Sequence, residues 1–528
     1  MVKRGLFHRF ICTLIGVTML LSFAACGREE TGRDDAPEDA DDSVQTAAGQ
    51  DSAVPRFTGD GEFTIRYVAS ESLNPFTCDN AYNSAVLSLI YQSIFKVDEN
   101  FRLESVLCSS IETEDNTVYY LSVEPVKMHD GSTLTADDVA YSINCGRTTG
   151  IYMSRLANIA SCLVVEDRVQ ITLSSPDATL AYDLDIPVIK YGTLDNAMPV
   201  GTGPYILNGT VLEPFSGYGE ELPLDRIVLT ELEDRQVPEA FAAGTVDMLI
   251  DDTGDDLDYN FHSDYEARYY GTTWLQYVGF NSGTPYLNAD MRKAIYSAVD
   301  RQGIVDSAYG GCGIPASLIL SPDHYAYPEA LESGAGYSVS RVESYITAAK
   351  LKDNDGDGFL EYKSGEEYVP FTLRFIVCTD SGKKVHAAQL IADSLKDMGF
   401  NVELTKLDKN SYMMALQEGE FDLYYGETVL AKDFDLSMLL GADGSFDYGK
   451  MGSASYDELI NSFLNAENDN AKREAASLLC TQVKDLASVV PVLYRQYAVY
   501  TQRGAIEGFS PTVSGALSDI ADWTVYVK

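Results

Sequence analysis

The sequence predicts a mixed α/β fold, and three observations lead to this prediction. Segments with strand character, at residues 63–68, 118–123, 169–173 and 226–232, are interspersed with segments of helical periodicity. Residues 371–425 follow the order strand, helix, strand, helix, strand, which is typical of a βαβ-type lobe. Hydrophobic residues make up 45% of the 528-residue chain, which is enough to bury two or three packed units.

The chain begins with the pattern of an export signal. Lys3, Arg4 and Arg9 form a basic region, and residues 10–25 form an uncharged apolar run that is short for a membrane span. We therefore expect residues 1–25 to be a signal peptide that is removed on export.

Cys26 directly follows the small residues that end this apolar run. The arrangement resembles a lipoprotein processing site, at which a signal peptidase would cut before Cys26 and the thiol would be diacylated. The resemblance implies a membrane anchor on Cys26, and a plain buried cysteine is the alternative.

Residues 26–56 are polar and strongly acidic, with almost nothing apolar to bury. We expect a disordered tether here, because burial in such a segment cannot offset the entropy lost on ordering it. Removal of residues 1–25 would take away three basic side chains and change the formal charge from −42 to −45. A protein this acidic repels phosphate, so nucleic-acid binding is not expected.

Residues 127–143 predict a turn followed by a helix. Their sequence is K-M-H-D-G-S-T-L-T-A-D-D-V-A-Y-S-I, in which the D-G pair favours a turn. Thr135 is a good N-cap, and Asp138 stands where an acidic side chain favours the first helical turn. We therefore expect a helix that begins at Ala136 and buries one apolar face.

The same string resembles the signature of the family 5 solute-binding proteins, the oligopeptide-, dipeptide- and nickel-binding receptors of ABC importers. The family pattern is close to F-H-D-G-x-P-L-T-A-x-D-V-x-Y-S. Met128 stands here in place of its aromatic residue and Thr133 in place of its proline. Neither change removes the turn or the cap.

Three further stretches resemble the same family: an L-N-P loop at residues 73–75, a G-T-G-P-Y turn at residues 201–205, and F-N followed by a helix over residues 291–301. We expect Gly201 and Gly203 to adopt backbone angles that side chains forbid. The helix is expected to be mainly a packing element, because one face carries the apolar residues Met291, Ala294, Ile295 and Ala298.

Within residues 371–425, the pattern predicts one helix in detail. Apolar residues recur at helical spacing from Val385 to Met398, and Gly399 is expected to end the helix. Val402 and Leu404 alternate in the strand that should follow.

The resemblance implies a periplasmic-binding-protein-like fold of type II, with two main lobes, a hinge and a smaller inserted domain. Lobe I should comprise residues 57–75, 192–272 and 497–528. The inserted domain should comprise residues 76–191, and lobe II residues 273–496.

The resemblance also implies a function. We expect a substrate-binding lipoprotein of an ABC importer, which captures an extracellular oligopeptide or dipeptide between its lobes and delivers it to membrane permease and ATPase subunits. The protein should be a monomer at the outer face of the cytoplasmic membrane, or in the periplasm, without a cofactor. A non-peptide solute, such as an oligosaccharide or a metal chelate, and a sensor role are the alternatives. An enzyme is not expected, because the sequence offers neither G-x-S-x-G nor a Ser/His/Asp constellation.

Candidate ligand-binding residues also come from the resemblance. Residues 430–437 resemble the family loop whose aspartate binds the α-amine of a bound peptide, so Asp433 is the first candidate and Asp435 the second. A carboxylate suits this role, because an ammonium group excluded from water needs a charged acceptor. A solvent-facing acidic loop is the alternative. The further candidates, each of which could equally belong to the core, are Asn74, Phe76, Trp274 and Tyr277.

One string suggests a metal. Residues 353–358 read D-N-D-G-D-G, like the start of an EF-hand calcium loop, so the candidate ligands are Asp353, Asp355, Asp357 and Glu361. The twelfth position is Ser364 instead of the bidentate glutamate, and a plain turn is the alternative.

Seven cysteines remain when Cys12 and Cys26 are set aside, and none of them has C-x-x-C spacing. Because seven is an odd number, at least one thiol must be unpaired. We expect buried free thiols, and neither the cysteines nor the five histidines support a zinc site.

Overall fold

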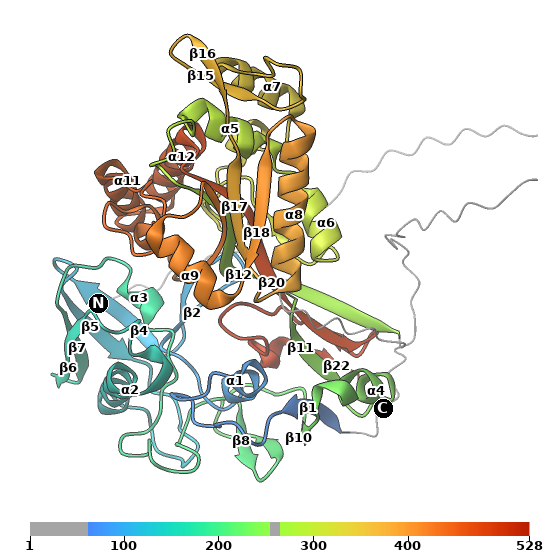
Figure 1. The fold of residues 1–528 in the computed structure, drawn as a ribbon. Helices are drawn as coiled ribbons and strands as arrows, with labels where there is room; N and C mark the ends of the chain where they lie inside the picture. Colours follow the sequence, from blue (N-terminus) through green and yellow to red (C-terminus); the bar gives the residue numbers. More distant parts are fainter. Residues whose placement is uncertain (1–61, 254–263, 527–528) are drawn as a thin grey trace, which may run out of the picture. The chain divides into compact units, whose positions relative to one another are not determined.

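The computed structural model describes residues 62–253 and 264–526, and this part of the chain is mixed α/β, as predicted (Figure 1). Its main element is an 11-stranded sheet with the order β18-β17-β19-β12-β20-β11-β1-β10-β9-β8, to which β13 adds by pairing with β20. The strands of this sheet are β1 (Phe63–Tyr67), β8 (Tyr205–Asn208), β9 (Val211–Pro214), β10 (Ile227–Glu231), β11 (Met248–Asp252), β12 (Tyr265–Phe280), β13 (Ile314–Pro315), β17 (Leu373–Cys378), β18 (Val402–Leu407), β19 (Leu423–Val429) and β20 (Val489–Gln502).

Two long antiparallel strands, β12 and β20, connect the two ends of the large sheet. The first part of β12 pairs with the part of β20 that also pairs with β11, and the last part of β12 lies between β20 and β19. The register of the β12–β20 pair shifts between Gly271 and Leu275 and again between Gln276 and Tyr277. Such shifts bend a strand locally, and the candidate site described below lies at the first of them.

The predicted order of elements in residues 371–425 is confirmed. β17 is parallel to both β18 and β19, and the connections are α8 (Gly382–Asp397) and α9 (Lys409–Glu418). Ser381 caps α8 by accepting a hydrogen bond from the Lys384 N–H. Gly399 follows the helix in the left-handed conformation, with φ of 88°, as expected of a glycine that ends a helix.

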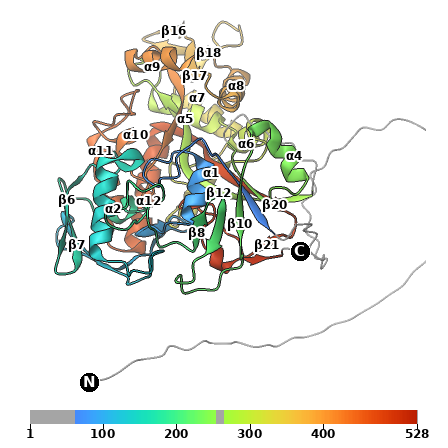
Figure 2. The ribbon, with the colours of Figure 1, turned by 90° about the horizontal axis from the view of Figure 1, so that it is seen from below.

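A separate four-stranded sheet carries the helix that was predicted to begin at Ala136. Its order is β4-β5-β7-β6, with β4 (Cys108–Thr113), β5 (Val118–Val123), β6 (Ile159–Val165) and β7 (Arg168–Leu173). α2 (Ala136–Thr148) begins at the predicted residue and lies beside β6 and β7 (Figure 2). The Thr135 N–H donates to the Asp138 carboxylate at 2.9 Å, which confirms the predicted cap.

Shorter elements complete the described chain. The small sheets are formed by β2 (Phe95–Val97) with β3 (Leu103–Ser105), by β14 (Leu351–Lys352), β15 (Glu361–Ser364) and β16 (Glu367–Pro370), and by β21 (Ile506–Glu507) with β22 (Thr524–Val525). The other helices are α1 (Ala81–Ser88), α3 (Leu180–Asp183), α4 (Val237–Ala242), α5 (Ala289–Ala298), α6 (Arg301–Ala308), α7 (Val339–Ala348), α10 (Ser437–Leu440), α11 (Ala454–Leu464) and α12 (Asp469–Leu486). Four 3₁₀ turns are η1 (Gly150–Tyr152), η2 (Asp234–Gln236), η3 (Glu329–Gly334) and η4 (Ile520–Asp522).

The prediction that Gly201 and Gly203 adopt backbone angles forbidden to other residues is wrong, because neither residue has a positive φ. Close packing requires them instead. An added Cβ would lie 2.4 Å from the carbonyl oxygen of Ile90 at Gly201 and 2.4 Å from its carbonyl carbon at Gly203. The Gly203 N–H also donates to this oxygen at 2.9 Å. The turn is therefore glycine-rich because it lies directly against the backbone of residue 90.

The single helix predicted over residues 291–301 is also corrected, since it is divided into α5 and α6. Val299 is extended, and the Asp300 carboxylate caps α6 by accepting from the Gly303 N–H at 3.1 Å. Because Asp300 is the N-cap of a new helix, α5 ends before it and does not continue into α6. The predicted packing face is confirmed, because its four residues are almost fully buried: Met291, Ala294, Ile295 and Ala298.

The predicted signal peptide (residues 1–25), the lipidation site at Cys26 and the whole acidic tether (residues 26–56) lie outside the described residues. Within residues 62–253 and 264–526, no helix has both the length and the apolar character needed to cross a membrane. The seven cysteines in this part of the chain are all free thiols, and six of them are buried.

Candidate ligand-binding cleft

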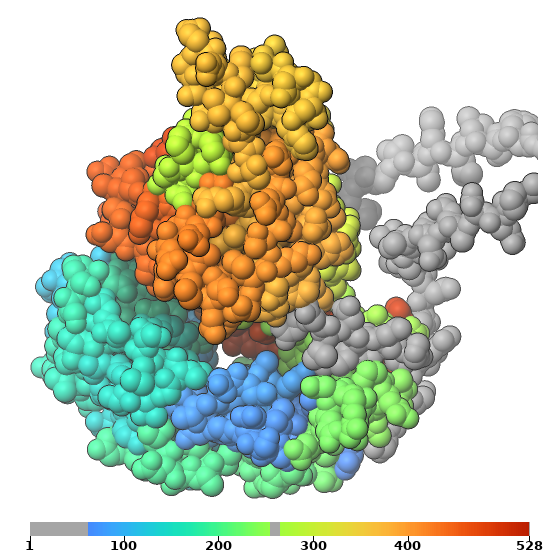
Figure 3. All heavy atoms as spheres, viewed as in Figure 1, coloured from blue at the N-terminus to red at the C-terminus, as the bar shows by residue number. Residues whose placement is uncertain are grey.

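A cavity of about 370 Å³ lies at the first register shift of β12. Its walls come from separate parts of the chain: the middle of β12, residues 429–432 at and after the end of β19, residues 155, 182 and 183, Tyr497 of β20, and Val513. Figure 3 shows the surface hollowed between the orange and the blue-to-green parts of the described chain. Concave sites of this size that bring distant segments together are the usual place for a small ligand.

Trp274 is the aromatic wall of this cavity, and a charged network holds its ring. The guanidinium group of Arg495 lies 4.1 Å from the ring centroid. Arg495 forms an ion pair with Asp252 and lies 3.5 Å from a carboxylate oxygen of Glu427. Gln276 donates to the same carboxylate at 2.6 Å. The Trp274 ring is therefore held by a cation and forms part of the cavity wall, where it can contact an apolar group.

Asp433 is buried, with 8% of its surface exposed; it does not line the cavity itself, but its neighbour Lys432 does. Its carboxylate accepts a hydrogen bond from the Asp435 N–H at 3.0 Å. Burial raises the pKa of Asp433, and the charge of Asp435 raises it further, while Lys472 opposes the shift. This burial excludes the alternative in which Asp433 belongs to a solvent-facing acidic loop.

Asp183, at the end of α3, is a cavity residue that the sequence analysis missed. Burial raises its pKa to about 7; Arg155 opposes this shift, and Asp433 and Asp435 add to it. Nothing in the local sequence distinguishes Asp183 from other aspartates. Only the tertiary structure brings it next to Asp433, 250 positions later in the numbering.

Cations surround this acidic group, but their charges are already engaged. Lys432 forms an ion pair with Asp185, and burial lowers its pKa. Burial also lowers the pKa of Lys472 to about 8, and its ammonium group lies over the Phe463 ring at 3.7 Å. Arg155, which lines the cavity, and Lys472 partly offset the charges of Asp183 and Asp433, so this end of the cavity has both acidic and basic groups around it.

The other predicted site residues are not brought to this cavity. The Asn74 side chain accepts from the Phe76 N–H at 3.0 Å and donates to the Leu194 carbonyl at 3.1 Å, so it holds the loop. Phe76 is fully buried against Tyr152. Tyr277 lines a different cavity. A binding role for these residues stays a prediction, and for Asn74 and Phe76 the observed contacts are structural.

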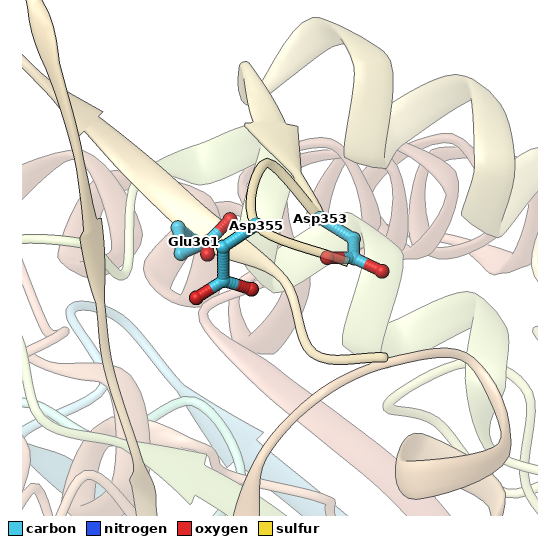
Figure 4. Close-up of side chains that lie close together, drawn as sticks. All are labelled: Asp353, Asp355 and Glu361. Carbon is cyan, nitrogen blue, oxygen red and sulfur yellow. The ribbon is translucent and has the colours of Figure 1, made fainter. Parts of the chain in front are cut away.

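The predicted calcium loop brings three of its four candidate ligands together. Oxygen atoms of Asp353, Asp355 and Glu361 lie within 4.8 Å of one another, whereas Asp357 is not part of the group (Figure 4). Each oxygen-bearing side chain already accepts backbone hydrogen bonds. Asp353 accepts from the N–H groups of residues 356 and 358 at 2.7 and 3.1 Å, and Glu361 accepts from that of residue 354 at 2.7 Å. The loop is therefore closed by its own backbone.

We expect calcium to leave the melting temperature unchanged, because three carboxylates fall short of the six to eight oxygen ligands that Ca²⁺ takes. Asp353→Asn should lower the free energy of unfolding by about 1–2 kcal/mol, since it weakens two charge-assisted hydrogen bonds. Asp357→Asn, which affects the single bond to the residue 359 N–H, is the matched control. Melting curves in calcium and in chelator test this, and a rise with calcium that Asp353→Asn removes would identify a calcium site.

With the geometry described, the chain can be compared with known proteins. Residues 102–449 match the family described as bacterial extracellular solute-binding proteins, family 5 Middle. The chain belongs to this family. The match covers more than half of the chain, and it confirms the resemblance drawn from residues 127–143. As a member of this family of extracellular solute-binding proteins, the chain is a binding protein and not an enzyme.

Curated relatives of this family 5 protein are distant. The oligopeptide-binding protein AppA of Bacillus subtilis (strain 168) is 24% identical over 362 residues, which are 62% of this chain and 65% of AppA. The glutathione-binding protein GsiB of Escherichia coli (strain K12) is 25% identical over 279 residues, which are 48% of this chain and 54% of GsiB. The chain thus spans between half and two thirds of the length of the curated relatives it matches.

Two solved structures show the fold. A nickel ABC transporter structure from Bacillus halodurans has a TM-score of 0.73 at 16% identity and covers 86% of this chain and 98% of its own. The putative peptide binding protein AppA from Clostridium difficile has a TM-score of 0.69 at 17% identity, with 88% of this chain and 100% of its own covered. The predicted type II periplasmic-binding-protein-like fold is therefore confirmed.

Proposed function

We propose that this family 5 protein is the substrate-binding lipoprotein of an ABC importer and that its ligand is a peptide. The peptide binds in the 370 Å³ cavity, with its terminal ammonium group near Asp433 and Asp183. The presence of Asp183 in the wall of this cavity, close to the buried Asp433, is the observation that carries the proposal. Cys26 anchors the protein at the outer face of the cytoplasmic membrane, and permease and ATPase subunits accept the released peptide.

An ammonium group supplies what the carboxylates at this end of the cavity lack. The carboxylates of Asp183, Asp433 and Asp435 repel one another, and burial disfavours their charged forms. A bound cation would favour ionisation and would replace its lost water by hydrogen bonds to carboxylate oxygens. The Trp274 side chain in the cavity wall offers apolar contact for the rest of the ligand.

The proposal includes closure of two lobes on the ligand. It also includes the boundary between lobe I and lobe II at residues 272 and 273. The register shift of β12 between Gly271 and Leu275 supports this boundary. One contact across the cleft would hold a closed state: the ion pair of Lys432 with Asp185.

Asp433→Asn should weaken peptide binding about 10- to 100-fold, since a neutral amide replaces the charged acceptor. Calorimetry with the tetrapeptide of alanine checks this on the purified mature protein. Asp435→Asn should have a smaller effect, and Asp443→Asn, which changes an exposed carboxylate, is the matched control.

The N-acetylated form of the same peptide separates recognition of the ammonium group from other effects of the mutation. It should bind the wild-type protein weakly, and Asp433→Asn should not weaken it further. Equal binding of the free and acetylated peptides would refute the proposed role of Asp433. If a nickel chelate binds and none of the tested peptides does, the ligand is a metal chelate and the peptide proposal is refuted.

A further inference from the structure

A second cavity, of about 200 Å³, lies at the carboxyl end of β17 and beside the middle of β19, next to the beginnings of α8 and α9. Ligands of α/β sheets bind in this position, outside the carboxyl ends of the strands. The walls of the cavity carry six aromatic side chains, which are Tyr277, Tyr412, Tyr424, Tyr425, Phe446 and Tyr448. Such a lining is apolar in its ring faces and is suited to a group that water solvates poorly.

The rings of this cavity are fixed before any ligand binds. Tyr424 makes edge-to-face contacts with Tyr277 at 5.8 Å and with Tyr448 at 6.1 Å between ring centroids. The Tyr412 hydroxyl donates to the Tyr425 carbonyl at 2.7 Å, and the Tyr425 hydroxyl donates to Gln276 at 2.7 Å. Because these hydroxyl groups are paired within the protein, the rings can offer their faces to a ligand without losing hydrogen bonds to water.

Gly426 shapes the wall of this cavity. A Cβ added at this residue would lie 2.7 Å from the Cζ atom of Tyr277, so only glycine lets the Tyr277 ring lie flat against β19. The ring of Tyr277 is 2% exposed. A glycine in the middle of a strand weakens it, and a close approach of this kind is a usual reason for its presence.

Three of the four charged residues at this cavity, Asp380, Lys384 and Glu427, are paired with one another and lead toward the first cavity. Lys384 lies 2.8 Å from Asp380 and 3.5 Å from Glu427. Glu427 in turn contacts Arg495, whose guanidinium group covers the Trp274 ring in the wall of the first cavity. A ligand bound at Trp274 therefore lies next to the network that borders the aromatic cavity.

We propose that the aromatic cavity is a second subsite, which takes one aromatic side chain of the peptide bound in the first cavity. This inference rests on the proposed peptide binding and names the class of peptide: one with an aromatic residue. The volume of about 200 Å³ is below the ~300–1,000 Å³ of a site for a whole ligand, so it fits a single ring-bearing side chain. Ring faces and edges at these distances favour an aromatic group over an aliphatic one.

Met413→Trp is the variant that tests this subsite. Met413 lies on α9, is half-buried and lines the aromatic cavity, so a larger side chain there would fill it. Met414→Trp adds the same volume at the next residue, which is 58% exposed and does not line the cavity. A Met414→Trp protein that behaves as wild type controls for effects of tryptophan on α9.

The probes are the tetrapeptide of alanine, four tetrapeptides with one tryptophan each, and indole, measured by calorimetry and by ligand-observed NMR. We expect one tryptophan position to bind at least about tenfold more tightly than alanine. Met413→Trp should abolish that gain and the indole signal, and should leave the affinity for the alanine peptide within about twofold.

Each outcome decides between the two proposals. If the alanine peptide binds and no tryptophan improves its affinity, the aromatic subsite is refuted and peptide binding stands. If no peptide binds, but indole binds the wild-type protein and does not bind Met413→Trp, the aromatic site is supported. Peptide binding is then refuted. If Met413→Trp leaves both the gain and the indole signal intact, the assigned location is wrong.

Discussion

Replacing Arg301 with methionine should lower the free energy of unfolding by about 2–4 kcal/mol. Arg301 is 3% exposed and begins α6. Its guanidinium group donates to the carbonyls of Ala316 and Pro491 at 2.8 and 2.7 Å and to those of Tyr296 and Val299 near the end of α5. Methionine would fill similar space but would leave four buried carbonyl oxygens without this donor, and the relief of a buried charge offsets only part of that cost.

Urea unfolding of the ligand-free protein measures this change. Arg473→Met removes an equal charge from an exposed residue and should leave the unfolding midpoint nearly unchanged. Arg301→Lys should lie between the two, because an ammonium group keeps the charge but cannot span the same set of carbonyls. An Arg301→Met protein as stable as Arg473→Met would show that other donors or water replace the guanidinium.

Asp183→Asn should stabilise the ligand-free protein increasingly as pH rises from about 4 to about 7. Burial raises the pKa of Asp183 to about 7 from an ordinary value of 3.8. Between these values the folded state retains a proton that the unfolded state has lost, so the wild-type protein loses stability with rising pH. Asparagine resembles the protonated form and does not titrate. The difference between variant and wild type should therefore grow to a maximum of about 4 kcal/mol near pH 8.

Unfolding midpoints measured at several pH values between 4 and 8 test this expectation. Asp195→Asn, at an exposed position, is the matched control and should show no such trend. The same titration predicts that binding of a cationic ligand releases protons near pH 7, because the ligand favours the ionised carboxylate. A stability difference that does not depend on pH would show that Asp183 is ionised in the folded protein throughout this range.

The sequence predicted helices and strands correctly where these depend on interactions between residues close in the chain. The helix start at Ala136 depends on Thr135 and Asp138, which are three residues apart, and the structure confirms it. The alternation and helical spacing in residues 371–425 likewise depend on near neighbours. The reason for Gly201 could not be predicted in this way, because its constraint is the backbone of Ile90, more than a hundred residues away.

Some residues of the candidate site could likewise be predicted from the sequence, and others could not. Asp433 and Trp274 were predicted through the family resemblance; the structure has Trp274 in the wall of the cavity and Asp433 buried close to the cavity residue Asp183. Asp183 and the aromatic cavity were not predicted. The tyrosines of that cavity come from β12, α9, β19 and the segment before α11, and no spacing along the chain reports their proximity.

The sequence by itself determined the mixed α/β class, the order of strands and helices in residues 371–425, and the family, because each depends on short patterns or on recurring motifs. Only the tertiary structure decided which carboxylates share a cavity, which glycines serve close packing, and where aromatic rings gather. These properties depend on side chains that meet across distant segments. Burial and mutual repulsion, which set the pKa of Asp183, exist only once those segments are packed together.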